Sequence, residues 1–185
     1  MMDTALPSRT WAGALRLEGH QAFLGILIAG ALVRAVFFLL FHHVALYTDE
    51  VQYQDIAVNL VEGRGFMMEG RLTSWRPPLY PFVLSLLYRM AGTTDPDVVR
   101  VFQGLLSLGT VAVVYLLART IFGPRIAVAA AGIMAFYPSL LFYNNHLLSE
   151  VVFIFLGAVT AYGFVAYLRA PRASMLKAES STRSQ

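Results

Sequence analysis

Two adjacent carboxylates are the strongest candidates for chemistry in this sequence. Asp49 and Glu50 follow Thr48, a residue type that often caps the first turn of a helix, and apolar residues then recur at helical spacing. The sequence predicts a helix from Asp49 that ends at Gly63, with Tyr53 lining the same site. Two carboxylates in a first turn can act as a base or hold a divalent cation, although an ordinary acidic first turn has the same pattern.

The second candidate is a cation that precedes a pair of prolines. Arg76 stands directly before Pro77 and Pro78, and proline is tolerated in the first turn of a helix. A guanidinium at the start of an apolar helix could bind a phosphate group through two parallel hydrogen bonds. The alternative is an arginine that only extends from the helix toward the membrane surface.

A third group of polar residues is associated with the apolar runs themselves. Glu150 begins an apolar run, and an ionisable residue in such a place is a functional candidate. His146 lies four residues earlier and could share a helix face with it, but two ligands are weak evidence for a metal, and a polar loop residue is the alternative. The sequence identifies no cofactor, although the acids could hold a divalent cation. Arg34 lies within an apolar run, so it must face other helices or a wet cavity.

The composition indicates what kind of protein must position these residues. The chain has 185 residues, of which 57% are hydrophobic and only 14% charged, and it contains no cysteine. Soluble domains have about 25% charged residues, so the composition argues against a soluble enzyme and against a disordered chain. The absence of cysteine excludes disulfides, thiolate metal sites and a cysteine nucleophile. The net charge of +3 requires no nucleic-acid partner.

The distribution of charge predicts an all-α integral membrane protein. About 20 apolar residues cross a bilayer as a helix, and the charge-poor runs predict four spans, at about 22–46, 98–120, 126–143 and 150–168. The loop 47–97 between the first two spans is expected to carry amphipathic juxtamembrane helices. Within it, the apolar run 77–88 is too short to span. The ends, 1–21 and 169–185, are expected to be cytoplasmic tails, the second one disordered.

The short turns predict the orientation of these spans. Arg119 and Arg125 flank one turn that has no acid, whereas the turn that ends at Glu150 has an acid and no base. Because basic residues concentrate in cytoplasmic loops, the first turn is expected to be cytoplasmic and the loop 47–97 external.

In order and topology, these features resemble the GT-C superfamily of membrane glycosyltransferases. The closest resemblance is to the group of protein mannosyltransferases, aminoarabinose transferases and rhizobial lipopolysaccharide transferases, and it covers about Leu24 to Tyr167. It rests on these segments: Tyr47-Thr48-Asp49-Glu50, Arg76-Pro77-Pro78-Leu79-Tyr80-Pro81-Phe82, Val99-Arg100-Val101-Phe102-Gln103, Leu117-Ala118-Arg119-Thr120-Ile121-Phe122-Gly123, and Tyr137-Pro138-Ser139-Leu140 leading to Leu148-Ser149-Glu150.

The resemblance implies a function and a role for each candidate. Such enzymes use a polyprenyl-phosphate-linked sugar on the external, periplasmic face of the plasma (inner) membrane, with membrane lipids around them. The implied base is Asp49, with Glu50 beside it; Arg76 would bind the lipid phosphate, and Glu150 would lie near the site. Trp75 replaces the metal-ligating acid of the aminoarabinose branch, which places a metal site in doubt. Family members are much longer, so the chain is expected to be an N-terminal fragment, inactive alone. The sequence identifies neither the sugar nor the acceptor.

Two other functions fit the same composition. The chain could be a non-catalytic membrane subunit that pairs with another chain through a small-residue face such as Ala127, Ala131 and Ala135. It could also be a small transporter, which Arg34 alone suggests. The spans lack a repeated set of polar residues, so the transporter ranks last.

Overall fold

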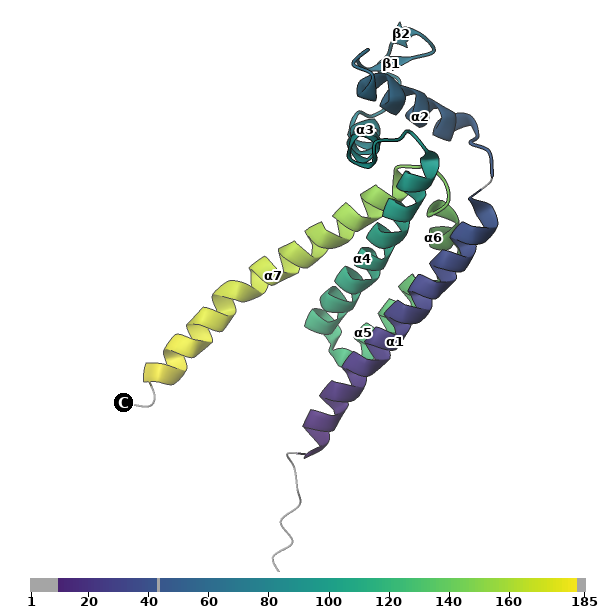
Figure 1. Cartoon of the computed structure of the whole chain (residues 1–185). Coiled ribbons are helices and arrows are strands. Elements are labelled where there is room, and N and C mark those ends of the chain that lie inside the picture. The colour runs from purple at the N-terminus through teal and green to yellow at the C-terminus, as the bar shows by residue number, and fades with distance from the viewer. Residues whose placement is uncertain (1–9, 43, 183–185) are drawn as a thin grey trace, which may run out of the picture.

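The computed structural model describes the backbone of residues 10–42 and 44–182 and the side chains of residues 19–42 and 44–170. This part of the chain is almost entirely helical, with one small antiparallel hairpin (Figure 1). In chain order, the elements are α1 (Thr10–Phe41), α2 (Thr48–Val61), β1 (Met67–Met68), β2 (Arg71–Leu72), α3 (Leu79–Ala91), α4 (Pro96–Phe122), α5 (Pro124–Phe136), α6 (Pro138–Tyr143) and α7 (Glu150–Thr182).

Three of the described helices are long and apolar enough to cross a membrane. The qualifying segments are Gly19–Phe41 of α1, Pro96–Phe122 of α4 and Glu150–Ala170 of α7. All three exceed the roughly 20 residues that a span requires. The prediction of an all-α membrane protein is therefore confirmed.

The segment predicted as the third span, 126–143, is divided into two helices. α5 has 13 residues, and α6 follows it after a break at Tyr137, whose backbone is extended (φ −67°, ψ 120°). Pro138 explains the break, because proline has no amide hydrogen to donate and forces the preceding residue out of the helical region. Together the two helices return the chain to the end at which α7 begins (Figure 1).

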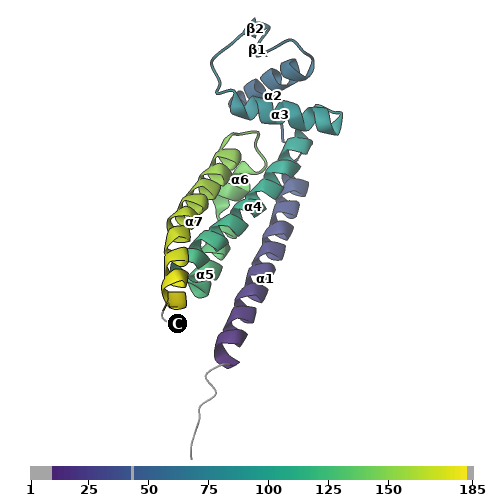
Figure 2. The same ribbon diagram turned by 90° about the vertical axis from the view of Figure 1, so that its left-hand side faces the viewer.

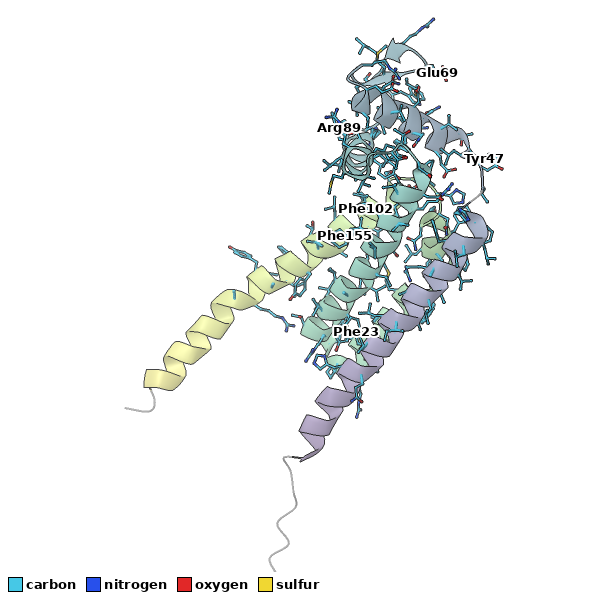
Figure 3. The ribbon with its side chains drawn as sticks, viewed as in Figure 1. Phe23, Tyr47, Glu69, Arg89, Phe102 and Phe155 are labelled. Carbon is cyan, nitrogen blue, oxygen red and sulfur yellow. The ribbon has the colours of Figure 1, made fainter. Side chains whose placement is uncertain are left out.

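Close helix packing at the centre of the bundle depends on small residues. Ala127, Ala131 and Ala135 of α5 are fully buried against α4 and α1, so this small-residue face is used inside the bundle. In the same cluster, the ring of Phe23, labelled in Figure 3, stacks on Tyr115 with centroids 3.9 Å apart. α7 packs on α4 near its beginning and diverges from the bundle toward its far end (Figure 1).

The region between α1 and α4 folds into a cap over one end of the bundle. α2 and α3 cross above the ends of the long helices, and the hairpin lies beyond them (Figure 2). α2 ends at Val61 with Glu62 as its C-cap, close to the predicted end at Gly63, but its N-cap is Tyr47 and not Thr48. α3 is an apolar helix of 13 residues, too short to span, as expected. We call this side of the molecule the capped end.

The two ends of the chain differ from their predicted form. α1 begins at Thr10, within the segment expected to be a tail. α7 continues to Thr182, where the polar composition of 169–185 predicted disorder. Alanine, leucine, lysine and glutamate in this segment are strong helix formers, which accounts for the continuation. The rest of the predicted tails, 1–9 and 183–185, lies outside the described residues.

Candidate functional site

The two adjacent acids of α2 lie in different environments. Successive side chains of a helix point about 100° apart, so one carboxylate can face the protein while its neighbour faces outward. The side chain of Asp49 is 50% exposed, whereas that of Glu50 is 5% exposed. Only Asp49 is therefore accessible to a ligand that approaches the capped end from outside.

The carboxylate of Glu50 fastens the start of α2 to the loop between α6 and α7. One oxygen accepts the backbone N–H of Leu147 at 2.7 Å and lies 3.2 Å from Nδ1 of His146. The other oxygen accepts the backbone N–H of Tyr47 at 3.0 Å. Figure 3 shows Tyr47 in the link between α1 and α2. Glu50 thus joins the start of α2 to the link before it and to a loop almost a hundred residues further along the chain.

Arg76 pairs with Asp49 on the exposed side of the same helix. Its Nη2 forms an ion pair with the Asp49 carboxylate, and its Nε donates to Oε1 of Gln52 at 2.8 Å. The guanidinium also lies over the ring of Tyr53, 5.2 Å from the centroid, within the range of a cation–π contact. These contacts hold the segment before α3 against the first turns of α2. They also place the cation of Arg76 in contact with the accessible carboxylate of Asp49.

A cavity of about 390 Å³ opens between residues of α2, α3 and α7; neither Asp49 nor Arg76 lines it, but its wall includes Tyr53, which the Arg76 guanidinium covers, and Pro77, which follows Arg76. Glu150, the first residue of α7, lies in its wall together with Tyr53, so two of the predicted site residues come together there. The far wall belongs to α7 and is apolar. The full lining is Tyr53, Pro77, Leu79, Tyr80, Ser149, Glu150, Val152, Phe153 and Leu156.

Gln103 is a buried residue that the sequence analysis did not assign to the site. Its Oε1 accepts the Tyr80 hydroxyl at 2.6 Å, and its Nε2 donates to the carbonyl of His146 at 2.7 Å. Burial raises the pKa of the Tyr80 phenol well above its ordinary value, and the nearby charge of Glu50 adds to the rise. Tyr80 therefore stays protonated and keeps donating to Gln103.

The spacing of polar residues along α4 could have identified Gln103. Arg100, Gln103, Ser107 and Thr110 recur every three or four residues and are all buried, which places them on one helix face. Polar residues at such a spacing in an apolar helix indicate contacts inside the bundle. Arg100 fits this reading, because its guanidinium binds the backbone carbonyls of Val44 and Asn145, both at 3.0 Å.

His146 does not form a metal pair with Glu150. It lies in the loop before α7, so the two side chains do not share a helix face, and its ring packs on Phe142 with centroids 4.1 Å apart. His146 lines a different cavity, with Phe37 and Phe41 of α1. Among the described residues, no cluster of three or more histidine, aspartate or glutamate side chains could hold a metal.

Arg34 is buried within the bundle and makes the kind of contacts that its position required. Its guanidinium donates to Oγ of Ser107 at 2.8 and 3.2 Å and to the carbonyls of Gly30 and Ala135, both at 3.0 Å. These contacts join α1 to α4 and α5. They make Arg34 a packing residue, well separated along the bundle from the acids of the capped end.

Together, the fold and the site define a multi-span helical membrane protein with a polar site at one end of its bundle. The chain belongs to the family described as dolichyl-phosphate-mannose-protein mannosyltransferase, whose model matches residues 75–178. Members of this family are membrane glycosyltransferases of the GT-C type, in agreement with the resemblance of the sequence motifs. Comparisons with curated proteins and with solved structures gave no match.

The matched region includes only part of the candidate site. It contains Arg76, Glu150, the helices α3 to α6 and most of α7, but it begins after α2 and so leaves out Asp49 and Glu50. The connection of these acids to the family region is spatial, through the Asp49–Arg76 ion pair and the contacts of Glu50 with the loop before α7.

Proposed function

We propose that the chain forms the catalytic face of a transferase that moves a sugar from a polyprenyl-phosphate donor to an acceptor hydroxyl. The observation that carries the proposal is the Asp49–Arg76 ion pair beside the cavity that Glu150 lines. A lipid-phosphate donor has a polar head and a long apolar chain. The cavity offers the same combination, with polar groups at the capped end and an apolar wall along α7.

Each site residue has a role in this reaction. The bond between the sugar and the phosphate breaks, and its electron pair leaves with the phosphate. The acceptor oxygen forms the new bond to the sugar and gives its proton to the carboxylate of Asp49, which acts as general base. Arg76 offsets the charge of the departing phosphate, and Tyr53 and Glu150 line the space for the sugar. Glu50 and His146 position the first turn of α2.

The ion pair itself suggests an order of binding. While it is paired with Arg76, the carboxylate of Asp49 is engaged by the guanidinium and is not free to meet an acceptor hydroxyl. A donor phosphate competes with Asp49 for the guanidinium of Arg76. Arrival of the donor therefore releases Asp49 to accept the proton of the second substrate, with Gln52 keeping Arg76 in place.

We place this reaction on the external face of the plasma membrane. The end of α4, which contains Arg119, and the start of α5, which contains Arg125, lie at the opposite end of the bundle from α2 (Figure 1), and the positive-inside rule assigns that end to the cytoplasm. The non-catalytic subunit is less well supported, because the small-residue face that it would use is already buried inside the bundle.

A transfer assay with a labelled polyprenyl-phosphate sugar tests the assignment of the base. Asp49→Asn keeps the size and neutralises the charge, so we expect transfer to fall at least 100-fold while membrane insertion stays normal. Glu62→Gln changes an exposed acid at the other end of α2 and should retain wild-type transfer. Full activity of Asp49→Asn would exclude it as the base.

A further inference from the structure

A small polar cavity lies inside the bundle, away from the proposed site. It lies between α4, α5, the end of α6 and the start of α7 and has a volume of about 10 Å³. Three polar side chains line it, namely Ser107, Thr110 and Asn144, and each is at most 4% exposed. The remaining wall is apolar and consists of Met134, Leu140, Val151 and Ile154.

The side chain of Asn144 is the unexplained group in this cavity. Neither its amide nitrogen nor its amide oxygen has a hydrogen-bond partner among the described residues. Its backbone is fully used, since the N–H donates to Leu140 and the carbonyl accepts from Gln103. An amide buried without partners costs a few kcal/mol, so a polar group that satisfies it would be strongly favoured.

The other two polar side chains offer complementary groups. The oxygen of Ser107 accepts two hydrogen bonds from Arg34, so both of its lone pairs are occupied and its hydroxyl can only donate. The hydroxyl of Thr110 donates to the carbonyl of Leu106 at 3.0 Å, which leaves its oxygen as an acceptor. The cavity therefore presents both donors and acceptors to its contents.

We propose that Asn144, Ser107 and Thr110 bind one internal water molecule. A volume of this size accommodates about one water, which needs two to four polar partners. Water alone can accept from Ser107 and Asn144 and also donate to Thr110. A chloride ion accepts only and would leave the Asn144 oxygen unpaired, and the charge of Arg34 disfavours a cation.

The water connects the membrane interior with the capped end. Arg34 contacts Ser107, Ser107 contacts the water, and the water contacts Asn144 at the end of α6. The loop that follows Asn144 carries His146 and Leu147 to Glu50. This link from Arg34 to Asn144 does not depend on the transferase activity.

Selective isotope labelling can detect this water directly. The chain has three asparagines, Asn59, Asn144 and Asn145, so ¹⁵N-asparagine labelling of the protein in micelles gives three side-chain amide signals, which single Leu substitutions assign. We expect a dipolar cross-peak between long-lived water and the Asn144 amide, unchanged when chloride is replaced by gluconate. Absence of the cross-peak, or dependence of the Asn144 shift on chloride, would overturn the proposal.

Thermal unfolding gives an independent readout. If Asn144 binds water, Asn144→Leu should lower the midpoint by about 2–4 °C, and the loss should be less than additive with Thr110→Val, because both contact the same water. Thr160→Val is the matched control, since its hydroxyl also bonds its own helix but is exposed. A higher midpoint for Asn144→Leu, or full additivity, would contradict a shared water.

Discussion

At the scale of single residues, the adjacent acids Asp49 and Glu50 have different roles. Asp49 is accessible and paired with Arg76, whereas Glu50 is buried and accepts two backbone N–H groups. Both lie in the first turn of α2, where the helix dipole favours negative charge. The sequence could place the two acids together, but it could not separate their roles. One partner of Glu50, Tyr47, is local, but Leu147 and His146 belong to a loop about a hundred residues away, and no local pattern predicts that contact.

Replacement of Glu50 should affect stability more than replacement of Asp49. Glu50→Gln puts an amide where two backbone donors need an acceptor, which costs about 1–3 kcal/mol. We expect the thermal midpoint of the protein in detergent to fall by about 2–4 °C per kcal/mol. Asp49→Asn lies on the exposed side and should leave the midpoint nearly unchanged. Equal effects of the two substitutions would show that Glu50 is not the structural member of the pair.

At the scale of elements, the capped end depends on buried tyrosines of α3. Tyr80 donates to Gln103 of α4, and Tyr88 donates to Gln54 of α2, so α3 is tied to both neighbours. Burial raises the pKa of both phenols above the ordinary value. The length of the apolar run 77–88 correctly predicted that α3 is too short to span. It could not predict these two contacts, because the partner glutamines have no sequence pattern that pairs them with tyrosine.

The raised pKa values predict a loss of stability in alkali. Unfolded tyrosines lose their protons near pH 10, whereas the folded phenols keep theirs, so the stabilising effect is complete below that pH and declines above it. We expect the thermal midpoint to fall as the pH rises from 9.5 to 11. Tyr80→Phe should make this decline shallower, whereas the exposed Tyr47→Phe should not. A midpoint independent of pH over this range would contradict the burial of these phenols.

The third predicted span shows where sequence reasoning about elements was incomplete. Its length and lack of charge gave one helix from 126 to 143, whereas the structure has α5 and α6 with Tyr137 extended between them. Pro138 is the feature of the sequence that could have predicted this break. Hydropathy is summed over a window and does not respond to a single missing amide hydrogen, which is why the break was not predicted.

At the scale of the whole molecule, the spans place all candidate site residues at one end. The distribution of the few charged residues along the sequence was sufficient to predict an all-helical membrane protein. It also predicted that the loop between the first two long helices contains helices of its own. It could not supply the packing of the cap on the bundle, which depends on side-chain contacts such as those of Arg100 with Val44 and of Gln103 with Tyr80. The family match adds the class of reaction.

The proposed orientation can be tested on the whole molecule, because the native chain has no cysteine. Leu72 in the hairpin and Phe122 at the end of α4 are both exposed and lie at opposite ends of the bundle. In intact cells, an impermeant thiol reagent should label Leu72→Cys and leave Phe122→Cys unlabelled. The reverse pattern would place the site in the cytoplasm.

The central claim is that Arg76 binds the phosphate of a lipid-linked donor, and donor binding tests it most directly. Binding of polyprenyl-phosphate sugar to the chain in nanodiscs can be measured without turnover, for wild type, Arg76→Ala and Arg71→Ala. Arg71 is an exposed arginine of the hairpin and controls for general charge. We predict at least a tenfold loss of affinity for Arg76→Ala and none for Arg71→Ala. Equal affinity of Arg76→Ala and wild type would contradict the account.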